Sequence, residues 1–88
     1  MEENEFYLDA LDALMELSLE NEDYTKAIRW HKMALRETPL DILLMLKLAE
    51  LYLEIYDLEQ AAFYYNEILN LNAVYPPALE GLKKIKTL

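Results

Sequence analysis

The chain matches itself when it is shifted by 34 residues. The segment 8–41 then lies over the segment 42–75, and the identities fall on apolar positions, on a small residue inside a helical stretch and on a turn. The identical pairs are Leu14/Leu48, Glu16/Glu50, Leu17/Leu51, Leu19/Leu53, Glu20/Glu54, Asp23/Asp57, Ala27/Ala61 and Leu35/Leu69. A third, shortened copy begins near Pro76. A period of this length indicates stacked units, because one unit cannot bury its apolar face alone.

The spacing of the apolar residues predicts that these units are helical. Apolar residues recur every three or four positions, as at Leu8, Leu11 and Leu14, which is the period of an α-helix. A single glycine and three prolines leave little turn chemistry for a β-protein. We therefore expect an all-α, helical-repeat solenoid of two antiparallel helix hairpins and a closing helix in one domain. The two repeats span about 8–41 and 42–75, and the capping helix about 76–87.

Capping residues predict where the helices begin and end. Asp23 and Asp57 are equivalent in the repeat, and each can accept a backbone N–H at the start of a helix. A helix should stop before Pro39, because the residue preceding proline avoids the α region. Pro76 or Pro77 can open the last helix, since proline is tolerated in a first turn. The expected helices cover about residues 3–20, 24–37, 41–55, 58–71 and 76–86.

The second copy reads Met45-x2-Leu48-Ala49-x2-Tyr52, followed by Ala61-x3-Tyr65. The first copy reads Leu11-x2-Leu14-Met15-x2-Ser18, followed by Ala27-x3-His31, Ala34 and Pro39. Both resemble the tetratricopeptide repeat family, whose pattern is Trp-x2-Leu-Gly-x2-Tyr, then Ala-x3-Phe and a closing proline. The resemblance covers the chain from about Leu8 to its end.

The chain also departs from that family pattern. Met15 and Ser18 reverse the usual order of small and large residues at the helix contact, which predicts an altered crossing in the first hairpin. Glu22 and Tyr56 replace the glycine of the turn, which removes the residue best suited to a left-handed backbone. Ala73 stands in place of the second closing proline.

Composition excludes several classes of function. A net charge of −9 disfavours nucleic acid and anionic membranes as partners and would attract basic ones. Without cysteine there is no disulfide framework and no thiolate zinc site, which favours a reducing, cytoplasmic location. The acidic N-terminus does not read as a signal peptide, and the short apolar runs predict no transmembrane helix.

No catalytic constellation is present in the sequence. His31 is the sole histidine and Ser18 the sole serine, and no signature joins them. His31 falls where the tetratricopeptide pattern has a core aromatic, so we expect it to be a packing residue. Gly81 is the only glycine, so there is no glycine-rich phosphate loop. We expect no enzymatic activity, no cofactor and no metal site.

Acidic residues share one face of the first helix. Asp9, Asp12, Glu16 and Glu20 follow one another at intervals of three and four. The resemblance implies that the first helix of each hairpin lines a concave, peptide-binding surface. The candidate partner-binding residues are Asp9, Asp12, Glu16, Leu43, Leu46, Lys47, Glu50, Leu53 and Glu54. They predict a basic or amphipathic protein or peptide as the partner. The alternative is an acidic face that only keeps the domain soluble.

Two further surfaces are candidates for contacts. Lys26, Arg29, Lys32 and Arg36 form a basic stripe on the second helix, which is either a solvated face or a contact for an acidic partner or a second copy. Phe63 and Tyr64, with Trp30, form either an aromatic interface patch or part of the core.

The functional hypothesis is a non-catalytic protein-interaction module. One alternative is a self-associating scaffold, or an engineered or excised repeat unit, with exposed leucines buried in a homodimer. Another is the helical-repeat interaction domain of a bacterial transcriptional regulator, which the stretch 23–52 resembles in style.

Overall fold

The structure is a computed structural model that describes residues 2–88, with side chains described from Ala10 onward. It is all-α: the described residues form five helices and no strand. The helices are α1 (Glu2–Glu20), α2 (Tyr24–Glu37), α3 (Ile42–Glu54), α4 (Leu58–Leu71) and α5 (Pro76–Thr87). The boundaries of all five helices agree with the sequence prediction to within about one residue at each end, so those predictions are confirmed.

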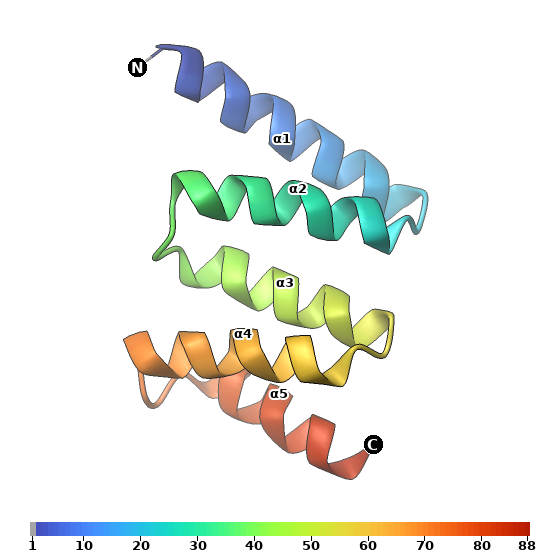
Figure 1. The fold of residues 1–88 in the computed structure, drawn as a ribbon, viewed down its shortest axis with the longest axis vertical. Helices are drawn as coiled ribbons and strands as arrows, with labels where there is room; N and C mark the ends of the chain where they lie inside the picture. Colours follow the sequence, from blue (N-terminus) through green and yellow to red (C-terminus); the bar gives the residue numbers. More distant parts are fainter. Residues whose placement is uncertain (1) are drawn as a thin grey trace.

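The helices lie side by side in chain order, each antiparallel to the one before (Figure 1). Each helix packs against its neighbours in sequence, and α3 also contacts α5. The helix α1 packs against α2 alone among the described residues. The molecule is elongated, with extents of 42 × 29 × 17 Å. Its first helix therefore has a neighbour on one side only, whereas α2, α3 and α4 each lie between two helices.

Small residues at the helix contacts allow this close packing. Ala27, Ala49, Ala61 and Ala78 are completely buried in one apolar cluster that reaches from α2 to α5. Because an alanine has only a methyl side chain, facing helices can approach closely and interdigitate their larger side chains. Leu48 and Ile68 are the largest fully buried side chains of that cluster. Burial of each contributes about 1.5–3 kcal/mol.

The α1–α2 and α3–α4 turns have the same geometry. The N–H of Asp23 donates to the Ser18 carbonyl (2.8 Å), and the N–H of Asp57 donates to the Tyr52 carbonyl (2.9 Å). These bonds, with a second bond one residue earlier in each turn, define the Schellman motif, whose C′ residue is left-handed. Glu22 and Tyr56 hold that place with φ of 56° and 59°. Both copies therefore keep the left-handed turn without its usual glycine.

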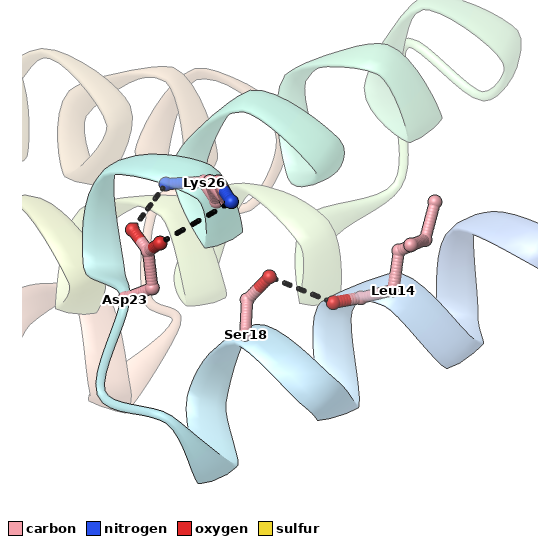
Figure 2. Close-up of polar contacts among 4 residues, drawn as sticks. All are labelled: Leu14, Ser18, Asp23 and Lys26. Atoms are coloured by element: carbon pink, nitrogen blue, oxygen red, sulfur yellow. Dashed lines mark hydrogen bonds and ion pairs between the residues drawn. The ribbon is translucent and has the colours of Figure 1, made fainter.

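Side chains also close the start of α2. Asp23 Oδ1 accepts a hydrogen bond from the Lys26 N–H (3.2 Å), and its Oδ2 lies 3.8 Å from the Lys26 ammonium (Figure 2). Asp57 caps α4 in the same way through the Gln60 N–H (3.3 Å). The predicted caps are thus confirmed. The hydroxyl of Ser18 is satisfied locally, because it donates to the Leu14 carbonyl at 2.8 Å (Figure 2).

The closing helix α5 packs closely against α4 at its sole glycine. Pro76 and Pro77 open the helix, as predicted. Gly81 is buried against the ring of Tyr65 from α4, and a Cβ at position 81 would overlap that ring. The absence of a side chain at Gly81 therefore sets how closely α5 approaches α4. None of the helices within residues 2–88 has both the length and the apolar character needed to cross a bilayer.

Candidate interaction groove

The described surface contains a groove of about 990 Å³. Its walls come from α3 and α5, and the α1–α2 hairpin closes one end through Leu19, Tyr24 and His31. The helices α3 and α5 also contact each other. A cavity of this size is in the range that binds ligands in proteins.

Apolar and aromatic side chains line part of the groove. Leu53 and Tyr56 contribute from α3 and its following turn, and Pro77 and Leu88 contribute from α5 and its C-terminal end. Tyr65 reaches the groove from α4. Burial, and secondarily the Glu50 carboxylate, raises the pKa of the Tyr65 phenol above its usual value. The phenol is therefore protonated at neutral pH and available as a hydrogen-bond donor.

The charges around the groove are mixed. One wall, from α3, carries Lys47, Glu50 and Glu54. The opposite wall, from α5, carries Glu80, Lys83 and Lys84. Three basic and three acidic groups therefore line the groove, so its lining is close to neutral although the chain as a whole has a net charge of −9.

The structure brings together four of the predicted partner-binding residues. Lys47, Glu50, Leu53 and Glu54 all line the groove. The remaining described candidates lie elsewhere: Asp12, Glu16 and Leu43 are exposed outside it, and Leu46 packs against the core. The side chain of Asp9 lies outside the described residues.

The α5 wall contributes residues that sequence reasoning did not single out. Lys83, Lys84, Thr87 and Leu88 line the groove together with Glu80. The 34-residue shift contained a signal for three of them, since Lys84 is equivalent to Glu50, Thr87 to Leu53 and Leu88 to Glu54. Extending the repeat into the third, shortened copy would have found these positions.

His31 forms part of the groove wall from within α2. It is buried, and its Nδ1 lies 2.7 Å from the Ala27 carbonyl oxygen. Because a carbonyl can only accept, Nδ1 carries the proton and donates in this bond. Burial lowers the pKa of His31 below its usual value, against the opposing effect of the Ala27 hydrogen bond, and Lys47 lowers it further. His31 is therefore a neutral packing residue at neutral pH.

The outer surface of α2 and α4 forms a separate, smaller hollow of about 480 Å³. Within this region Lys32 lies over the Tyr52 ring, 5.6 Å from its centroid, and Tyr52 stacks on Tyr64. Phe63 contacts Tyr64 edge to face. Lys32 is thus engaged in a cation–π contact, worth about 0.5–1 kcal/mol at an exposed site, and the aromatic side chains are engaged mainly with one another.

Among residues with described positions, no three histidine, aspartate or glutamate side chains converge as a metal site. Known protein-family models give no match to the chain, and curated protein sequences give none either.

Proposed function

We propose that the chain is a tetratricopeptide-like repeat domain that works as a non-catalytic, cytoplasmic protein-interaction module. Its groove binds a basic or amphipathic peptide or helix. The observation that carries this proposal is the groove itself, in which Leu53, Tyr56 and Leu88 lie beside the carboxylates of Glu50 and Glu54. Apolar anchors surrounded by charged groups are what an amphipathic segment requires.

The two walls favour one orientation of the ligand. Glu50 and Glu54 on α3 attract lysine and arginine side chains, whereas Lys83 and Lys84 on α5 attract acidic ones. Leucines of the ligand enter between the walls and contact Leu53 and Pro77. The net charge of −9 adds a long-range attraction for basic partners.

Peptide selection tests this function. Random peptides displayed on phage are panned against the immobilised protein, and enriched peptides are measured by fluorescence anisotropy. We expect enrichment of sequences that combine leucines with lysine or arginine. The double variant Glu50→Lys/Glu54→Lys should weaken binding about tenfold or more, which corresponds to about 1.4 kcal/mol.

The matched control is Glu37→Lys/Glu59→Lys. It makes the same change in charge at two exposed glutamates that do not line the groove, and it should leave the affinity within about twofold of the wild type. If both double variants lost the same affinity, the effect would come from the change in net charge and not from the groove. Unchanged binding in the groove variant would refute the proposed site.

A further inference from the structure

An exposed apolar face lies on α1, outside the side of the helix that is buried against α2. This surface is called here the outer face of α1, and it consists of Ala10, Ala13, Leu14 and Leu17. They are spaced by three and four residues, so they share one side of the helix. All four are exposed, Leu14 at 37% and Leu17 at 54%. The buried side of the same helix is formed by other residues, namely Leu11, Met15 and Ser18.

The internal repeat shows what such a face does elsewhere in the same chain. A shift of 68 residues, which is two repeats, places the outer face of α1 on Ala78, Gly81, Leu82 and Ile85 of α5. There, Ala78 and Gly81 are buried, and Leu82 and Ile85 pack against the core. Two small residues followed by two large aliphatic ones therefore form a helix-docking face in α5, with Tyr65 of α4 seated directly on Gly81. The equivalent face of α1 has the same order of two small and two large aliphatic residues, with Ala13 in place of Gly81, and within the described chain no helix packs on it.

The charge around this face indicates the chemistry of its occupant. Glu16 and Glu20 run along its edge, since Glu16 follows Ala13 by three residues and Glu20 follows Leu17 by three. Both are exposed, and α1 contains seven acidic residues and no basic one. Glu20 also lies in the last turn, where the helix dipole disfavours an acid and favours a cation. Lysine or arginine on an incoming helix would offset the unfavourable interaction of Glu20 with the helix dipole.

A second copy of the chain is a poorer occupant. Two α1 helices that met through their outer faces would bring Glu16 and Glu20 of each copy towards the same acids of the other, and like charges at an interface destabilise it. Each copy also has a net charge of −9.

We infer that the outer face of α1 docks an amphipathic helix of a partner protein, with a stripe of leucine-sized residues flanked by lysine or arginine. The docked helix contacts α1 at the positions through which α5 contacts α4, but it lies farther from the backbone at Ala13 than Tyr65 lies from Gly81, because Ala13 has a Cβ. A partner helix of the length of α4, 14 residues, covers the four face residues. This inference does not depend on the groove, because none of these four residues lines it.

Two synthetic helical peptides serve as probes. Both carry leucines at intervals of three and four, and they differ in having either lysines or glutamates beside the leucine stripe. Binding to the full chain is measured by fluorescence anisotropy. The lysine probe should bind about tenfold or more tightly than the glutamate probe, and the difference should shrink as salt is raised.

Leu17→Glu should weaken the lysine probe about tenfold or more, and the matched control Leu43→Glu should leave it within about twofold. Both leucines are exposed, so neither change disturbs the core. When the lysine probe is added to the wild type, the amide NMR shifts that change should belong to residues of α1. Any of four results would overturn the inference. They are equal affinity for the two probes, no binding of either at millimolar concentration, no effect of Leu17→Glu on binding, and amide shift changes confined to the α3–α5 groove. A wild-type dimer that Leu17→Glu dissociates would also overturn the inference, since a second copy would then occupy the face.

Discussion

The contact between Gly81 and Tyr65 gives the sharpest quantitative prediction. In the interior of an exposed helix, glycine to alanine stabilises by about 1 kcal/mol through helix propensity. At position 81 the added Cβ would overlap three carbons of the Tyr65 ring, which is only 2% exposed and has little room to move. Overpacking of this kind costs about 1–3 kcal/mol, and the extent of the overlap places the cost at the upper end.

The expected net effect of Gly81→Ala is therefore a loss of about 2 kcal/mol in the free energy of unfolding. Urea unfolding followed by circular dichroism at the helix band measures it. With a slope of about 1 kcal/mol per molar urea for a small domain, the midpoint should fall by about 2 M.

Removing the ring supplies the matched control. In a Tyr65→Leu background the Cβ no longer meets an aromatic ring, so Gly81→Ala should become neutral or stabilising, and the double-mutant cycle should give a coupling of about 2 kcal/mol or more. If Gly81→Ala stabilises the wild type, or if the two changes are simply additive, the reasoning about α5 docking is refuted.

Three further predictions concern caps, turns and pH. Asp41→Ala removes the oxygen that accepts the Leu43 N–H (3.0 Å) and should cost about 1 kcal/mol in denaturant unfolding, whereas Asp41→Asn should cost much less. Tyr56→Gly should raise the free energy of unfolding by about 0.5–1 kcal/mol in the same assay, because it relieves the strain of a left-handed residue at φ 59°. Tyr56→Ala retains the strain, so an equal rise in that variant would contradict the explanation. Since the folded-state pKa of His31 is lowered, its neutral form contributes stability that is present above about pH 6.5 and is lost as the pH falls below it. His31→Phe should reduce the difference in thermal midpoint between pH 7.5 and 5.5, and an unchanged difference would exclude His31 as its source.

The helices and their caps were predictable because their causes are local. A period of three to four residues, the acceptor side chains at Asp23 and Asp57, and the ring of Pro76 act within a few residues of where they stand. The left-handed backbone at Glu22 and Tyr56 was not predicted, because the loss of glycine at these positions was interpreted as the loss of the residue best suited to that conformation.

The composition of the groove was only partly predictable, because it depends on which helices meet. The α3 residues Glu50, Leu53 and Glu54 line one hollow together with Lys47. The lysines of α5 enter the same hollow only because α5 folds back beside α3, a contact between segments far apart in sequence. Asp12 and Glu16 lie outside it, since α1 packs on α2 and, in the part of the chain that is described, contributes to the groove through Leu19 near its C-terminal end.

The packing of Gly81 against Tyr65 was beyond sequence reasoning for a similar reason. In the sequence, a glycine within a helical stretch indicates only a weak helix former. Its contact with an aromatic ring from another helix becomes visible only in three dimensions.

The most direct test of the proposed function is an amide NMR titration of the isotope-labelled chain with a peptide selected by panning. The account predicts that the largest shifts fall on the two groove walls, at residues such as Leu53, Glu54, Gly81 and Lys84. Shifts confined to the outer surface of α2 and α4, around Lys32 and Phe63, would contradict it.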